Sequence, residues 1–222
     1  MVCVMRNTIR NILFDFDGVL AESVNIKTEA FRSMYLPFGN DIANRVVNHH
    51  IENGGMSRFE KFKLYHEKWL GIKLSPRLLE QLTEKFSMLV LKGVVSSPEV
   101  KGAHKFLETN KTNIKYWIIT GTPTNEIIDI VEKRGIKHYF MGIYGSPVKK
   151  DVWANQIIRE FSLNLDETIF VGDAIADYNA AMKNKVKFIL RETVDNIPLF
   201  KDYKGHRVKD MDELNLLIEN GS

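Results

Sequence analysis

Two carboxylates at the end of an apolar run are the most suggestive chemical feature of this sequence. Residues 11–14, Asn-Ile-Leu-Phe, lead directly into Asp15 and Asp17, and Gly18 follows. The run predicts a buried strand, and Gly18 permits a sharp turn after it, so both acids can face one pocket. In open α/β sheets that pocket lies beyond the carboxyl ends of the strands. Two acids there repel unless a cation or a shared proton compensates them, and Mg²⁺ is a hard cation that prefers oxygen ligands.

A second apolar run, residues 114–119, ends at Thr120 and Gly121. A helix is expected to begin near Thr124, so its unpaired N–H groups and positive dipole end would point toward the strand end. A hydroxyl group beside these N–H groups can hold an oxyanion. The pattern therefore indicates a phosphate-binding turn.

Two more polar groups follow later apolar runs. Lys149 and Lys150 come after the third run, and a lysine there can hold a phosphate and neutralise a nucleophilic carboxylate. Asp173 and Asp177 come after the fourth, at a spacing that lets both reach a metal from one loop. A nucleophilic carboxylate beside a metal and a second acid is the chemistry of aspartyl-phosphate enzymes.

The ordered motifs resemble those of the haloacid dehalogenase (HAD) superfamily, and they span essentially the whole chain: Asp15-x-Asp17-Gly18, Thr120, Lys149 or Lys150, and Gly172-Asp173-x-x-x-Asp177. The resemblance implies that Asp15 attacks the substrate phosphorus and that Asp17 serves as acid and base. It also implies a Mg²⁺ ion held by the Asp15 carboxylate, the Asp17 carbonyl and Asp173. Asp177 would support that ligand set.

Two details refine the resemblance. The sequence Gly145-Ser146-Pro147 resembles the Gly-Ser-Pro-x-x-Lys pattern of the family, which favours Lys150 over Lys149 as the phosphate-binding lysine. Asp17 argues against the dehalogenase branch, because that branch resembles a pattern without the second aspartate. Phosphoryl chemistry is therefore expected.

Helical and apolar segments alternate from residue 99 onward. Strands are expected at 114–119, 139–144, 168–172 and 186–190, and helices at 100–107, 125–134, 152–161 and 178–183. This alternation predicts an α/β fold with a Rossmann-like parallel sheet covered by helices on both faces.

The segment between the first two predicted strands has a helical pattern without strands. Apolar residues recur at helical spacing over 22–35, 57–70 and 76–91, and Pro76 suits a first helical turn. This predicts a small all-helical cap of residues 21–95, inserted into a catalytic core of residues 1–20 and 96–222. The arrangement resembles the helical-cap class of the family.

The cap contains a glycine turn between His49 and Arg58. Ser57 can cap the following helix, with Glu60 completing a capping box, so the stretch can be an ordinary helix start. It also resembles the Gly-x-Ser-Arg turn of the β-phosphoglucomutase cap, which makes Gly55, Ser57, Arg58 and His50 candidates for substrate specificity. Adjacent histidines such as His49 and His50 point apart, so zinc binding is not expected.

Bulk properties set further limits. A net charge of +3 over 222 residues, with the charges interspersed, does not favour nucleic-acid binding. The single Cys3 excludes an intramolecular disulfide, and Met1 to Met5 are too short for a signal peptide or membrane span. A cytoplasmic protein, monomeric or homodimeric, is expected.

These features together favour a Mg²⁺-dependent phosphatase acting on a small phosphorylated metabolite, such as a sugar or polyol phosphate. A phosphomutase of the β-phosphoglucomutase type uses the same aspartyl phosphate. This alternative function remains because of Arg58. A non-catalytic binding module is a third possibility, although the complete set of acids argues against it.

Overall fold

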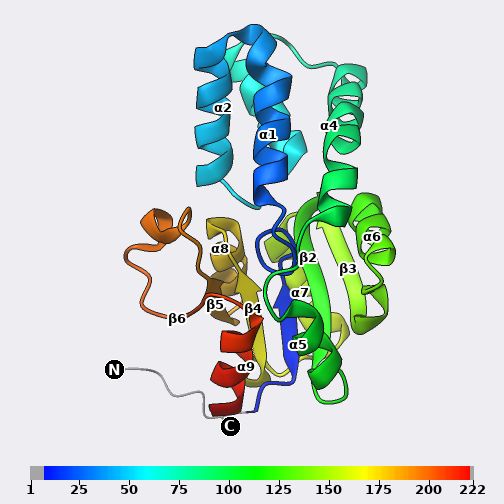
Figure 1. Ribbon diagram of the computed structural model, residues 1–222, viewed down its shortest axis with the longest axis vertical. Helices are drawn as coiled ribbons and strands as arrows, with labels where there is room; N and C mark the ends of the chain where they lie inside the picture. The colour runs from blue at the N-terminus through cyan, green and yellow to red at the C-terminus, as the bar shows by residue number, and fades with distance from the viewer. Residues whose placement is uncertain (1–7, 221–222) are drawn as a thin grey trace.

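The computed structural model describes residues 8–220, and a parallel six-stranded sheet lies at its centre (Figure 1). The strand order is β3-β2-β1-β4-β5-β6. The central strand β1 therefore lies between β2 and β4, so three of the motif-bearing strand ends are neighbours. The strands are β1 (Asn11–Phe14), β2 (Lys115–Pro123), β3 (Phe140–Ser146), β4 (Thr168–Gly172), β5 (Lys187–Arg191) and β6 (His206–Val208).

Helices cover both faces of the sheet, as predicted. Ile12 and Phe14 of β1 pack in the cluster that contains the buried residues of α5 (Ala103–Asn110), α6 (Thr124–Lys133) and α9 (Met211–Asn220). The intervening Leu13 packs with α7 (Lys150–Glu160) and α8 (Ile175–Lys183) on the other face. This alternation is the two-residue period of a strand that is buried on both sides.

The remaining α-helices gather at one end of the molecule, above the strand ends (Figure 1). They are α1 (Val24–Tyr35), α2 (Asn40–Glu52), α3 (Arg58–Lys63), a π-helical continuation (Leu64–Trp69) and α4 (Pro76–Ser96). Phe31 lies at the centre of their core, with ring centroids 5.7 Å from Phe62 and 4.4 Å from Phe86. Aromatic packing therefore holds helices α1, α3 and α4 together.

Two connections join these helices to the sheet, and they lie side by side. The Glu22 N–H donates to the Pro98 carbonyl at 2.9 Å, and the Val100 N–H donates to the Leu20 carbonyl at 3.1 Å. This pairing supports our proposal that residues 21–95 form a cap on a core of residues 1–20 and 96–222. We use the names cap and core in this sense below.

Several elements differ from the prediction. The prediction did not include helix α2. His49 and His50 lie in the last turn of this helix rather than in a loop. Ala43, Val46, Val47 and His50 are buried along α2 at helical spacing, so the sequence carries a helical pattern here that the prediction did not use. Strand β6 and helix α9 were also missed, and the bounds of other elements differ by a few residues.

Two further expectations concern the chain as a whole. The prediction for Cys3 and the amino-terminal residues falls outside the described range. Within residues 8–220, none of the helices combines the length and apolar character that crossing a lipid bilayer requires.

Candidate active site

Asp15 and Lys150 form the centre of the site at the carboxyl end of β1. The Lys150 ammonium lies 2.8 Å from the Asp15 carboxylate and 2.6 Å from that of Asp177, and all three side chains are buried. Burial opposes the charged lysine, but the two carboxylates outweigh it and raise the pKa of Lys150 above its usual value. Lys149 is instead exposed and lies 3.8 Å from Glu60. The geometry thus pairs Lys150, rather than Lys149, with Asp15.

A group of three acids has the composition of a cation site. Ligand oxygens of Asp15, Asp173 and Asp177 all lie within 4.8 Å of one another. Burial, followed by the charge of Asp15, raises the pKa of Asp173 well above its usual range and that of Asp177 to about 7. Such crowding of carboxylates is costly without a cation, and oxygen donors are those that Mg²⁺ prefers. The residues therefore fit the expected metal.

Gly18 allows this crowding. Its φ is +76°, and a Cβ atom at this position would lie 2.1 Å from the Asp173 carboxylate oxygen. A side chain there would strain the backbone and displace Asp173. The sharp turn predicted after the two acids of β1 is therefore confirmed, and it also makes space for the third acid.

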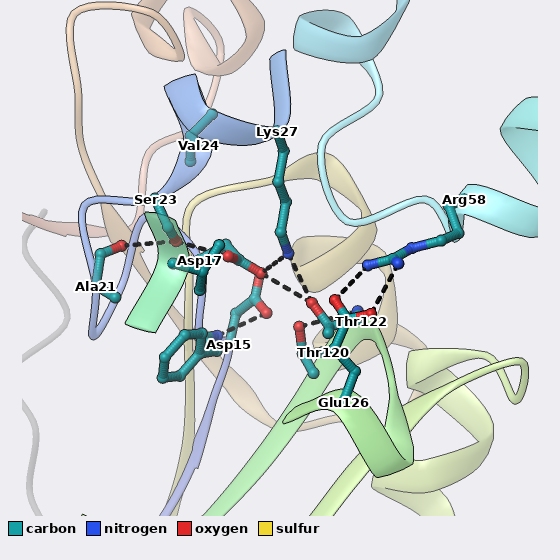
Figure 2. Close-up of polar contacts among 12 residues, drawn as sticks. Asp15, Asp17, Ala21, Ser23, Val24, Lys27, Arg58, Thr120, Thr122 and Glu126 are labelled. Carbon is teal, nitrogen blue, oxygen red and sulfur yellow. Dashed lines mark hydrogen bonds and ion pairs between the residues drawn. The ribbon is translucent and has the colours of Figure 1, made fainter. Parts of the chain in front are cut away.

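Asp17 lies in a separate polar group that faces the cap (Figure 2). Its carboxylate accepts a hydrogen bond from Ser23 at 2.6 Å and from the Thr122 hydroxyl at 3.1 Å, and it forms an ion pair with Lys27. The Lys27 ammonium also donates to the Thr122 hydroxyl at 2.6 Å. Burial alone would raise the pKa of Asp17, but Lys27 and the hydrogen bonds outweigh it and lower this pKa.

Lys27 and Thr122 were missed at the sequence level. Lys27 lies on α1, ten residues after Asp17. The sequence predicted that helix, but it did not indicate that this residue faces the core. Thr122 follows the predicted Thr120-Gly121 turn directly, so only its position in that turn could have suggested a role.

The cap loop reaches the predicted phosphate-binding turn. A Cβ atom built on Gly121 would lie 2.7 Å from the Gly55 carbonyl oxygen, and one built on Gly55 would lie 3.2 Å from the Lys150 ammonium. Thr120 is buried beside this contact, and its hydroxyl accepts from the Thr122 N–H at 3.3 Å. The two glycines therefore let the cap and core backbones approach closely at the strand ends.

The residues after this loop anchor helix α3. The Ser57 hydroxyl accepts from the Glu60 N–H at 3.3 Å, as expected for a helix cap. The Glu60 carboxylate accepts from the Ser57 hydroxyl at 3.2 Å. This geometry accounts for Ser57 as the residue that caps helix α3.

Arg58 lines the site, and its guanidinium is already paired (Figure 2). It donates to both Glu126 oxygens at 2.8 and 2.6 Å and to the Ser87 hydroxyl at 2.8 Å. Glu126 lies in the first turn of core helix α6, so the ion pair connects cap to core. The side chains of Arg58 and Glu126 are only 4% and 9% exposed.

His50 is buried beside a second basic residue, Lys61 of α3. The Lys61 ammonium lies 2.8 Å from the His50 Nδ1 atom. Burial, with the charge of Lys61 as the next cause, lowers the pKa of His50 well below its usual value, so Lys61 donates to a neutral imidazole. Lys61 was missed at the sequence level, where it appeared as one charge in a helix.

These groups surround one cavity of about 550 Å³ between cap and core. The core contributes Asp15, Asp17 and Asp173 to its lining, and the cap contributes Lys27, Arg58 and Lys61. The size suits a small molecule. These three acids line the core side beside Arg191, and the three basic side chains line the cap side beside Glu22.

Comparison with known proteins agrees with this architecture. A phosphoglycolate phosphatase from Vibrio cholerae serotype O1 is 27% identical over 194 residues, covering 78% of this chain and 80% of the relative. A candidate β-phosphoglucomutase structure from Bacteroides vulgatus has a TM-score of 0.77 at 13% identity, covering 96% of this chain and 89% of the other. A predicted phosphoglycolate phosphatase structure from Haemophilus somnus has a TM-score of 0.72 at 19% identity, covering 95% and 98%.

Residues 12–191 match the sequence profile of the family described as haloacid dehalogenase-like hydrolase. The match includes every predicted motif from β1 to the loop after β4, and it extends over most of the chain. It confirms the resemblance and the enzyme class inferred from the ordered motifs. The protein therefore belongs to the haloacid dehalogenase-like hydrolase family.

Proposed function

We propose that this protein is a Mg²⁺-dependent phosphatase that hydrolyses a small phosphorylated metabolite through an aspartyl phosphate on Asp15. The observation that carries the proposal is the position of Asp15. Its carboxylate lies 2.8 Å from the Lys150 ammonium and belongs to a group of three acids suited to a divalent cation. A phosphate can be placed there only if cations compensate the charge of these acids, and Lys150 already supplies one.

In the first step, a carboxylate oxygen of Asp15 forms a bond to the substrate phosphorus, and the bond from phosphorus to the ester oxygen breaks. The leaving alkoxide takes a proton from the Asp17 carboxyl group. Thr120 and the N–H groups of the turn around Gly121 would hold the phosphoryl oxygens, with Lys150 balancing their charge. The products of this step are an alcohol and the phosphorylated Asp15.

In the second step, Asp17 takes a proton from a water molecule whose oxygen attacks the phosphorus. The bond between phosphorus and Asp15 breaks, and inorganic phosphate leaves. The ion pair with Lys27 lowers the pKa of Asp17, so the structure has Asp17 in the form that a base requires. Protonation before the first step requires that this ion pair loosens.

A divalent cation would be held by Asp15 and Asp173, with Asp177 in support and the Asp17 carbonyl as the ligand that the family resemblance implies. When bound, it would neutralise charge on the phosphoryl oxygens. The donor set favours Mg²⁺ over softer metals, because the clustered groups are carboxylates.

The substrate is a small phosphate ester in this proposal, because the cavity of about 550 Å³ between cap and core suits a small molecule. The name of the Vibrio relative makes phosphoglycolate one candidate, beside the sugar and polyol phosphates expected from the sequence. We prefer hydrolysis to mutase activity. The argument for a mutase was Arg58, and its guanidinium is already bonded to Glu126 and Ser87.

The test is release of inorganic phosphate from a panel of phosphoglycolate and sugar, polyol and nucleotide monophosphates, with and without Mg²⁺. Mg²⁺-dependent release that is lost in Asp15→Asn would support the proposal. If no substrate releases phosphate while a phosphoryl donor labels Asp15, phosphomutase activity replaces phosphatase activity as the proposed function. Without release or labelling, the proposed chemistry is wrong.

A further inference from the structure

Lys61 differs from the other basic residues of the cavity. Four lysine or arginine side chains line it, and three of them have a carboxylate partner: Lys27 with Asp17, Arg58 with Glu126, and Arg191 with Glu22. In the part of the chain that the structure describes, Lys61 has no carboxylate within ion-pair distance; its nearest polar partner is His50. Lys61 is therefore a buried amino group whose charged form has no counter-ion among these residues.

The surroundings of Lys61 make this lack of a partner costly. Its side chain is 1% exposed, so bulk water does not solvate the ammonium. The ammonium lies 5.7 Å from the centre of the Phe31 ring, and that ring packs against His50 at 4.8 Å. An isolated charge in such an apolar setting is unfavourable, and an anion placed beside it interacts strongly because little water screens the pair.

The position of Lys61 also fits a ligand. It lies one helical turn after Arg58 on α3, on the same side of the helix. The cavity that it lines continues to Asp15 and Thr120, where the phosphoryl group would lie. A molecule bound at Asp15 can therefore extend toward the cap and place a second group near Lys61.

We propose that Lys61, supported by His50, binds a second anionic group of the substrate. This inference rests on the proposed phosphatase function and narrows it. The substrate class is then a small phosphate ester that also carries a carboxylate or a second phosphate, in preference to a neutral sugar or polyol phosphate. Lys61 acts as the specificity-determining residue, and the role assigned to Arg58 from the sequence passes to it.

The experiment compares three substrates of similar size: phosphoglycolate, ethyl phosphate and a propanediol bisphosphate. Burial and the charges of Lys27 and Lys150 lower the pKa of Lys61 to about 7, so assays at pH 6 keep its ammonium charged. The variant is Lys61→Met, which keeps the length of the side chain and removes the charge. Lys63→Met on the exposed side of the same helix is the matched control.

The wild-type protein should prefer an anionic substrate to ethyl phosphate by about 10- to 100-fold in kcat/KM, the range of a hydrogen bond to a charged group. Lys61→Met should abolish this preference by raising KM for the anionic substrates, and its loss of kcat/KM should be smaller for ethyl phosphate than for either of them. Lys63→Met should keep the preference of the wild-type protein. Preference for phosphoglycolate identifies a carboxylate, and preference for the bisphosphate identifies a second phosphate. Equal losses on all three substrates would overturn the proposal.

Two measurements keep the inference separate from folding and from the proposed function. If Lys61→Met does not fold, the substrate preference of the wild-type protein decides. A ratio near one between kcat/KM for the anionic substrates and kcat/KM for ethyl phosphate rejects the proposal. If no phosphate ester is hydrolysed, the phosphatase proposal fails, and calorimetric titration of the wild-type protein decides the anion site. Tighter binding of phosphoglycolate or the bisphosphate than of ethyl phosphate supports it, and equal binding rejects it.

Discussion

Arg58 of the cap and Glu126 of the core form a buried ion pair with two hydrogen bonds, of 2.8 and 2.6 Å. The Ser87 hydroxyl donates to the same Glu126 carboxylate, and the Arg58 guanidinium lies 4.5 Å from the centre of the Phe86 ring. Ser87 and Phe86 thus hold Arg58 within the cap, and Glu126 connects it to the core. A substrate would have to displace one of these bonds to reach the guanidinium.

This ion pair predicts that Arg58→Ala and Glu126→Gln have similar effects. Each change breaks the connection between cap and core and leaves a buried partner unsatisfied, which costs about 3–5 kcal/mol in a fully buried pair. We expect kcat/KM to fall by about tenfold or more for every phosphate ester, including a minimal aryl phosphate, because the cap closes less often.

The steady-state kinetics of both variants on phosphoglycolate and the aryl phosphate measure this effect. Glu132→Gln, an exposed change on the same helix α6, is the control. If Arg58→Ala alters only substrate preference while Glu126→Gln resembles the wild-type protein, Arg58 contacts substrate as the sequence suggested, and the ion pair has no role in closure.

Asp15→Asn should abolish turnover and preserve the fold. The amide is nearly isosteric with the carboxylate but is a poor nucleophile, and Lys150 keeps Asp177 as a partner at 2.6 Å. We expect phosphate release to fall by about 10³-fold or more, as for other essential nucleophiles. Circular dichroism and the release assay are compared with Asp41→Asn, an exposed change in the cap. If Asp15→Asn keeps full activity, Asp15 is not the nucleophile.

The sequence predicted the core of this site well, because each motif follows a strand whose apolar run is easy to recognise. Parallel strands bring their carboxyl ends to one edge, so Asp15, Thr120 and Asp173 meet there without further information. The Gly-Ser-Pro-x-x-Lys pattern favoured Lys150 over Lys149, and the structure adds the physical reason, because adjacent residues at a helix start point in different directions. The start of α7 at Lys150 turns this side chain toward Asp15.

The cap side of the site was much less predictable. The sequence places His50 in a polar stretch at the end of helix α2, and only the packing of the helices reveals that this residue is buried. Lys27, Lys61 and Glu126 each appear in the sequence as one charge on an amphipathic helix. Their roles depend on how the cap sits on the core, which local periodicity does not determine.

Lys27→Met should change the pH dependence of the second chemical step. Lys27 lowers the pKa of Asp17, so its removal should raise that pKa. A base must be deprotonated, so the acidic limb of phosphoenzyme hydrolysis should move to higher pH. Single-turnover hydrolysis at a series of pH values measures this shift, with the exposed Lys85→Met of α4 as the control. If the acidic limb does not move, Lys27 does not control the pKa of Asp17 in this step.

The crowded acids predict how stability of the metal-free protein depends on pH. The pKa values of Asp173 and Asp177 are raised on folding, the latter to about 7, whereas an unfolded aspartate titrates near 3.9. Between these values the folded state binds more protons than the unfolded state, so the free energy of unfolding falls as pH rises from about 4 to about 7. The slope can reach about 1.4 kcal/mol per pH unit for each group.

Mg²⁺ should reverse this trend, because the ion compensates the carboxylates and binds the folded state alone. Saturation at about 100 times the dissociation constant adds about 2.7 kcal/mol to the free energy of unfolding. Urea unfolding at several pH values, with and without Mg²⁺, measures both effects. Asp173→Asn should respond little to Mg²⁺ and lose part of the pH dependence, whereas the exposed Asp166→Asn should resemble the wild-type protein. If Asp173→Asn keeps the full Mg²⁺ response, Asp173 is not a metal ligand, and the cation site must be sought elsewhere.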